Sequence, residues 1–170
     1  MRCYHFGNYY LSSIQQGIQA AHAQMELFNK YKEIDLYDYA LSTGSNPPEY
    51  IVRRSNLAKQ LFEWSTKHKT MVCLSGGNNK DLLEIKELLT QNDMYPWSYF
   101  CEDEDSLGAV LTNVAIVLPE EIYETARLIR ERQYVVTDLK VLDLSGVVIK
   151  ELNEFDYNLI QTLNKCQLAK

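Results

Sequence analysis

Three short stretches of the sequence carry residues whose types and spacing can support chemistry. The first is GIQAAHAQ, in which Gln19 and His22 stand three residues apart among alanines. That spacing puts both side chains on one face of a helix, and histidine is the usual proton shuttle near neutral pH. A core histidine bonded to a backbone carbonyl fits the same pattern, so both interpretations stay open.

The second stretch, CEDEDSLGAVLT, places four carboxylates before Gly108 and a strand that carries Thr112. Clustered carboxylates raise one another's pKa, and they can yield a general base or hold a divalent cation. The alternatives are a solvated acidic loop and a threonine that simply faces a helix. We expect neither a bound metal nor a cofactor.

The third stretch, LSGGNNKDL, follows an apolar run and leads into a helical pattern. Glycines let the backbone turn sharply, and unpaired amides at a helix start can bind an anion. The candidate phosphate-binding residues are Gly76, Gly77, Asn78, Asn79 and Lys80. An ordinary strand-to-helix turn, in which the asparagines only cap the helix, explains the pattern equally well.

Alternating strand and helix patterns surround these stretches and must position them. Strands are expected at Arg2–Phe6, Thr70–Leu74, Tyr95–Cys101 and Val110–Leu118, with one or two more after Tyr134. Helices are expected at Ile14–Lys30, from Ser55, at Lys80–Gln91, from Pro119 and at Glu151–Lys170. In the first helix, Ser13 and Gln16 have the spacing of a capping box. One apolar stripe follows it, formed by Ile14, Ile18, Ala21, Met25 and Phe28.

This order predicts an α/β fold in three layers, with a small mixed sheet of about four strands flanked by helices. Residues 1–119 form the expected domain, and residues 120–170 form a C-terminal helical extension packed on it. Residues 31–51 lack a helical or strand pattern and predict a long loop, either a lid or an interface arm. The apolar residues of the last helix pack on the sheet or, alternatively, on a partner.

The bulk composition narrows the class of protein. The 170 residues carry a net charge of −6, which disfavours a long nucleic acid as the main ligand. The basic residues between Arg53 and Lys69 are interpreted as a solvated helix face. No apolar run reaches the length of about 18 residues that a membrane span needs. The four cysteines form no CxxC pair, so we expect reduced thiols in a cytoplasmic protein.

Taken together and in order, the three stretches resemble one family, the type 2 peptidyl-tRNA hydrolases. IQQGIQAAHA looks like the Q-x-x-H-A helix of that family, and HKTMVCLSGGNNKDL looks like its second strand and following helix. FCEDEDSLGAVLTNVAIVLP looks like its acid–glycine–threonine block. The resemblance covers residues 1–119, allows for an insertion near residues 35–50, and does not reach the extension.

The resemblance implies a mixed four-stranded sheet, frequent dimerisation and hydrolysis of the ester that joins a peptide to tRNA. It implies catalytic roles for Gln19, His22, Asp105 (or Asp103) and Thr112. The family carries a lysine four residues before the helix glutamine, where this sequence has Gln15. An amide does not supply that positive charge, and Lys80 is the candidate substitute.

Two other classes of function remain open. The chain can bind or cleave a small nucleotide, such as a cyclic signal that a viral counter-defence protein removes, with tyrosines stacking on the base. It can also be a non-enzymatic interaction module that uses its C-terminal apolar stripe. The expected partners are a nucleotide-containing or tRNA-derived ligand and a second copy in a homodimer.

Overall fold

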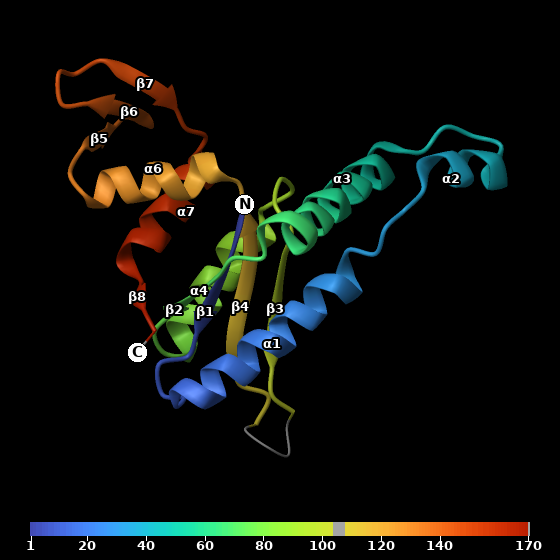
Figure 1. Ribbon diagram of the computed structural model, residues 1–170, viewed down its shortest axis with the longest axis horizontal. Helices are drawn as coiled ribbons and strands as arrows, with labels where there is room; N and C mark the ends of the chain where they lie inside the picture. Colours follow the sequence, from blue (N-terminus) through green and yellow to red (C-terminus); the bar gives the residue numbers. More distant parts are fainter. Residues whose placement is uncertain (104–107, 170) are drawn as a thin grey trace.

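The computed structural model describes residues 1–103 and 108–169, and it confirms the prediction of an α/β fold with a mixed sheet (Figure 1). The first half contains β1 (Arg2–Gly7), α1 (Ser13–Lys30), α2 (Leu36–Thr43), α3 (Glu49–Glu63), the π-helical turn η1 (Trp64–His68), β2 (Met71–Ser75) and α4 (Asn79–Thr90). The second half contains β3 (Trp97–Cys101), β4 (Leu111–Leu118), α6 (Glu120–Arg130), β5 (Tyr134–Thr137), β6 (Lys140–Asp143), β7 (Val148–Glu151), α7 (Glu154–Lys165) and β8 (Gln167–Leu168).

The main sheet has five strands in the order β3-β4-β1-β2-β8. β1 runs parallel to β2 and antiparallel to β4, and β3 pairs antiparallel with β4. The predicted four strands are thus joined by a fifth from the extension, since Leu168 pairs with Leu74 beside β2. Because β1 and β2 are parallel, their carboxyl ends share one edge, where α1 and α4 begin.

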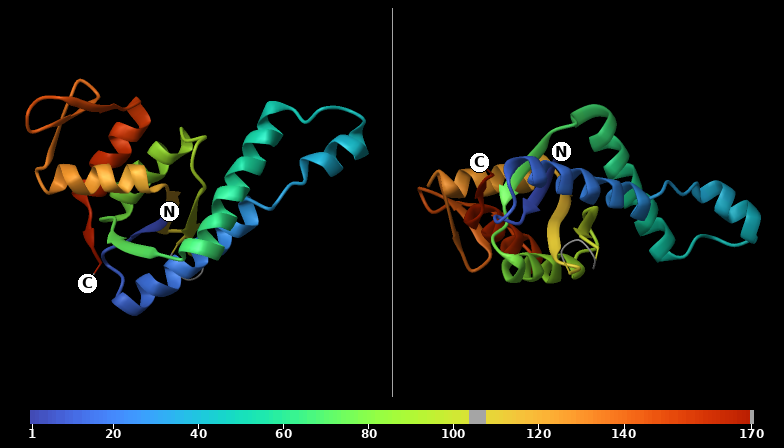
Figure 2. Two further views of the ribbon diagram at one scale, coloured as in Figure 1. Left: turned by 45° about the horizontal axis from the view of Figure 1, so that its top comes forward. Right: turned by 90° about the horizontal axis from the view of Figure 1, so that it is seen from below.

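Two apolar cores cover the two faces of the sheet. One face packs against α1 and α3, and the other packs against α4, α6 and α7. Figure 2 shows these helices on opposite sides of the strands. All eight residues of β4 are buried, which is expected for a central strand covered on both faces. The C-terminal apolar stripe packs in the second core through Leu152, Leu159 and Leu163.

Helix α1 presents a different face to the sheet than its larger apolar residues suggest. Ala20 and Ala23 are buried against the strands, because small side chains let the helix lie close to them. The apolar stripe points outward instead, and Ile14 is 78% exposed. The capping box is also shifted by one residue from the prediction, to Ser12 and Gln15.

Residues 31–51 form a helical arm, whereas the sequence predicts a long loop there. Asp35 caps α2 by accepting hydrogen bonds from the amides of Tyr37 and Asp38. Gly44 ends the helix in the left-handed conformation. None of the α2 residues is buried, and Figure 1 shows α2 and the start of α3 reaching away from the sheet. The helix was missed because its tyrosines and aspartates have low helix propensity.

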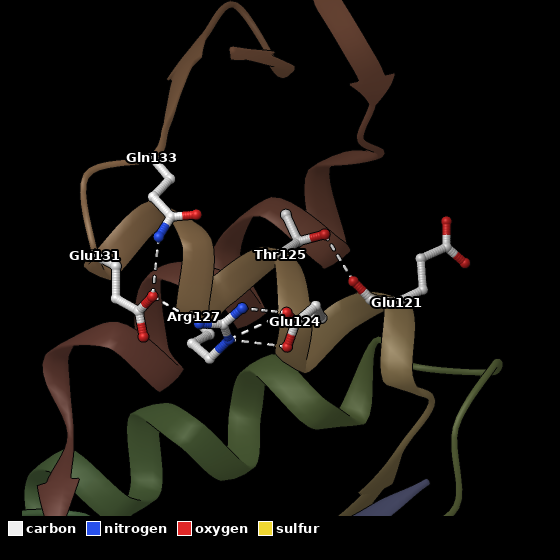
Figure 3. Close-up of polar contacts among 6 residues, drawn as sticks. All are labelled: Glu121, Glu124, Thr125, Arg127, Glu131 and Gln133. Atoms are coloured by element: carbon white, nitrogen blue, oxygen red, sulfur yellow. Dashed lines mark hydrogen bonds and ion pairs between the residues drawn. The ribbon is translucent and has the colours of Figure 1, made fainter. Parts of the chain in front are cut away.

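The extension contains α6, a separate three-stranded sheet in the order β5-β6-β7, and α7. On the surface of α6, the Arg127 guanidinium binds both Glu124 and Glu131 (Figure 3). These ion pairs at i,i+3 and i,i+4 spacing support the helix and involve all three nitrogens of the guanidinium. Within the described ranges, no helix has the length and apolarity needed to cross a membrane.

Candidate functional site

A β-bulge aims Thr112 at helix α1. Phe100 pairs with Asn113 and Cys101 pairs with Leu111, so Thr112 is the extra residue between two pairs. In a regular strand Thr112 would share a face with Val114, which packs in the core on the α4 side. The bulge turns its side chain toward α1, and bulges of this kind are common beside active sites.

Three buried or half-buried side chains from distant segments meet in one hydrogen-bonded chain. The Thr112 hydroxyl lies 2.9 Å from the Gln19 side-chain oxygen, to which it donates, and 3.2 Å from the Phe100 carbonyl oxygen. The Gln19 amide nitrogen donates to a carboxylate oxygen of Glu102. Gln19 is only 5% exposed and Thr112 only 1%, so both are held in fixed positions.

His22 stands beside this chain on the exposed side of α1. Its ring stacks on Phe100, with ring centroids 4.5 Å apart and planes 14° from parallel. The imidazole is exposed, so the core-histidine interpretation does not apply to it. Phe100 therefore orients His22 next to the Gln19–Thr112 pair while leaving its ring nitrogens accessible to a ligand.

The acid that reaches Gln19 is Glu102, the first residue of the acidic run. Asp105 lies outside the described residues. Asp103 is exposed just after β3, and its carbonyl oxygen accepts a hydrogen bond of 3.3 Å from the amide of Ala109. Nothing in the sequence distinguishes Glu102 from the other three carboxylates of the run, because the choice depends on where the bulged strand meets α1.

Gln15, at the position of the family's lysine, serves the helix rather than the site. Its side-chain oxygen lies 3.0 Å from both the backbone nitrogen and the hydroxyl of Ser12. The backbone N–H of Gln15 in turn donates to the Ser12 hydroxyl, which completes the capping box. A lysine could not accept these hydrogen bonds, so the glutamine has a local structural reason to be here.

The hydrogen bonds of the SGGNNK turn fit the capping interpretation. The side-chain oxygen of Asn78 accepts hydrogen bonds from the backbone amides of Lys80 and Asp81. The Asp81 carboxylate accepts one from the backbone amide of Asn78. Asn79 opens helix α4 and is exposed. Lys80 is also exposed, with its ammonium 3.9 Å from Glu84. The backbone amides of Lys80 and Asp81, in the first turn of the helix, are therefore satisfied by the chain itself.

A cavity of about 850 Å³ lies at this turn, between the starts of α1 and α4 and the C-terminal strand β8. Two of the predicted phosphate-binding residues, Gly76 and Gly77, line it. Asp81, Glu84 and Lys165 line it as well, and because two carboxylates outnumber one ammonium among these described residues, the charge of the cavity disfavours a phosphate. Neither Gln19 nor Thr112 lines this cavity, so the turn forms a site separate from the Gln19–Thr112 chain.

Gly77→Ala should destabilise the protein by about 3 kcal/mol, because it combines backbone strain with a close contact. Gly77 has a φ of 88°, and an added Cβ would lie 2.3 Å from an Asp81 carboxylate oxygen. Gly146 has a φ of 85° with nothing within 4 Å, so Gly146→Ala should cost only about 1 kcal/mol. Urea unfolding of both variants measures the difference, and equal losses would refute the close-packing argument.

A second buried polar chain lies under α1 and was not predicted from the sequence. His5 is fully buried, with Nδ1 3.1 Å from the Asn113 side-chain oxygen and Nε2 3.3 Å from the Cys3 sulfur. Burial raises the pKa of the Cys3 thiol well above its ordinary value, so Cys3 keeps its proton and donates to Nε2. Nδ1 then carries the imidazole proton and donates to Asn113.

The same burial lowers the pKa of His5 to about 4, because a charged ring would lose its hydration. His5 is therefore neutral at physiological pH, and this histidine supports the sheet rather than a ligand. Its signal in the sequence was weak, since alternation along β1 places it on a buried face but does not reveal its partners.

Comparison with known proteins adds no relative. A scan against models of protein families found no match, and a search of curated proteins found none either. Within residues 1–103 and 108–169, no group of three or more histidine, cysteine or acidic side chains is arranged to hold a metal ion. The four cysteines are free thiols. The site must therefore be judged on its own geometry.

Proposed function

We propose that the chain is a hydrolase of the peptidyl-tRNA hydrolase type, acting through water on an ester bond of an RNA- or nucleotide-containing substrate. The observation that supports this best is the meeting of Gln19, Thr112 and Glu102 beside His22. Gln19, His22 and Thr112 are also the residues that the family resemblance predicts as catalytic. Gln19 and Thr112 stand 93 residues apart in the chain, yet their side chains are hydrogen-bonded.

Each group has a role in ester hydrolysis. A carboxylate has two oxygens, so Glu102 can hold Gln19 with one and a water molecule with the other. The water oxygen attacks the ester carbon, its proton passes to the carboxylate, and negative charge develops on the carbonyl oxygen. The Gln19 side-chain nitrogen has two protons: one is donated to Glu102, and the other is the donor that stabilises this charge. When the tetrahedral intermediate collapses, the bond between the carbonyl carbon and the ribose oxygen breaks, and His22 is the group able to protonate that leaving oxygen. Asp105 remains the alternative acid that the family resemblance suggests.

A deacylation assay tests the proposal directly. Purified protein is incubated with a tRNA that carries an amino acid blocked at its amino group, and release of the amino acid is followed. We expect turnover, with the ester bond cleaved and the tRNA left with a free ribose hydroxyl. Intact substrate at all enzyme concentrations and across neutral pH would reject the proposal.

A further inference from the structure

Edge strand β3 carries a cluster in which lysines from two helices meet two aromatic rings. We call Lys30, Lys86, Trp97 and Tyr99 the β3 edge site. The Lys30 ammonium lies 3.7 Å from the Trp97 ring centroid, and the Lys86 ammonium lies 3.8 Å from the Tyr99 ring centroid. The two rings are stacked, with centroids 6.2 Å apart. Lys30 comes from α1 and Lys86 from α4, so helices on opposite faces of the sheet converge at its edge.

The charge of this edge differs from that of the chain as a whole. Lys30 donates a 3.0 Å hydrogen bond to the Trp97 carbonyl oxygen, and Arg54 donates to the Lys30 carbonyl oxygen, which brings a third cation close. Partial burial lowers the pKa of Lys30 to about 8, so Lys30 is still mostly protonated at neutral pH. Three cations gathered on a chain of net charge −6 form a local positive surface.

A cleft of about 550 Å³ lies beside this edge. It runs between α1 and β3 and is lined by Lys30, Tyr99 and Phe100, among other residues. Phe100 is the residue on which His22 stacks. Glu26 is the one carboxylate among the described residues that line the cleft. The cleft thus places Lys30 on the same surface as Phe100, the ring on which His22 stacks, and the Phe100 carbonyl oxygen lies 3.2 Å from the Thr112 hydroxyl.

We propose that the β3 edge site binds a short single-stranded stretch of RNA, with phosphates at Lys30 and Lys86 and an unpaired base against Tyr99. Lysine ammoniums beside exposed aromatic rings are the usual features of single-strand binding, and stacking needs unpaired bases. Tyr99 is 39% exposed, so a base can reach the part of its ring that Lys86 and Trp97 leave uncovered. The small number of cations fits two or three phosphates rather than a long duplex. This inference deepens the proposed function and rests on it for the nature of the substrate.

Fluorescence anisotropy with a labelled single-stranded RNA of about six nucleotides tests the site without any catalysis. We expect tighter binding than to a duplex of the same sequence. The logarithm of the affinity should fall with the logarithm of salt concentration with a slope of about −1.4, which corresponds to two phosphates. Lys86→Gln should reduce that slope by about 0.7, and Tyr99→Leu should weaken binding about tenfold.

Lys140→Gln is the matched control, because it removes the same charge from strand β6 in the separate sheet. It should leave both affinity and slope unchanged. An equal loss in Lys140→Gln and Lys86→Gln, or equal binding of single strand and duplex, would overturn the proposal. RNA binding without ester hydrolysis would refute the proposed function and keep this site, whereas hydrolysis by a protein that does not bind the oligonucleotide would refute the site alone.

Discussion

Thr112→Val is expected to lower the rate of ester hydrolysis by about 100-fold, a loss of the size seen when one positioned donor is removed from an active site. Valine has nearly the same shape but lacks the hydroxyl that donates to Gln19 at 2.9 Å. The Gln19 amide is then free to rotate away from Glu102, so both the donor and the carboxylate lose their fixed positions. The measurement is the steady-state rate on blocked aminoacyl-tRNA, with Thr112→Ser expected to keep most of the activity.

The control for this substitution must remove an equivalent buried hydroxyl that does no chemistry. Ser98 is 2% exposed, and its hydroxyl donates a hydrogen bond of 2.6 Å to the Ala23 carbonyl oxygen. This bond joins β3 to α1. Ser98→Ala and Thr112→Val should each destabilise the fold by about 1 to 3 kcal/mol. If both variants lose activity to the same extent, the Thr112 effect reflects weaker packing of α1 and not a role in the site.

The elements that carry the candidate site could be predicted from the sequence because their signals are local. The helix of Gln19 and His22 and the strand of Thr112 both form where periodicity places them. The bulge at Thr112 could not be predicted, because it depends on pairing with β3 across the sheet. The same holds for the choice of Glu102, which follows from where that strand ends.

Other differences between the predicted and the observed structure of α1 arise from side-chain packing and from competition between two possible N-terminal caps. The stripe that includes Ile14 has a helical period, but the period alone does not say which face is buried. Ala20 and Ala23 decide the matter, because close approach to the sheet requires small side chains. Ser12 and Ser13 both begin a capping-box pattern, and only the three-dimensional start of the helix selects Ser12 with Gln15.

Lowering the pH from 7 to 4 is expected to reduce the free energy of unfolding by roughly 3 kcal/mol through His5 alone. The pKa of His5 falls from an ordinary value of 6.5 to about 4 in the folded protein, because its ring is buried. Between these values the unfolded chain binds a proton that the folded chain does not. Stability therefore declines as the pH falls through 6.5 and levels off below about 4. Urea unfolding at several pH values measures this decline.

The direction of this effect follows from the partners of His5 as well as from burial. Protonation of Nε2 would point a donor at the Cys3 thiol, which is itself a donor to that nitrogen at 3.3 Å. A charged ring would therefore lose a hydrogen bond in addition to its hydration, while the bond from Nδ1 to Asn113 would remain.

His5→Asn removes the titrating group, so the stability of this variant should change much less over the same pH range, although it starts lower at pH 7. The exposed His68 is the matched control, and His68→Asn should keep the wild-type pH profile. A His5→Asn profile parallel to that of the wild type would show that other groups, and not this buried imidazole, cause the acid sensitivity.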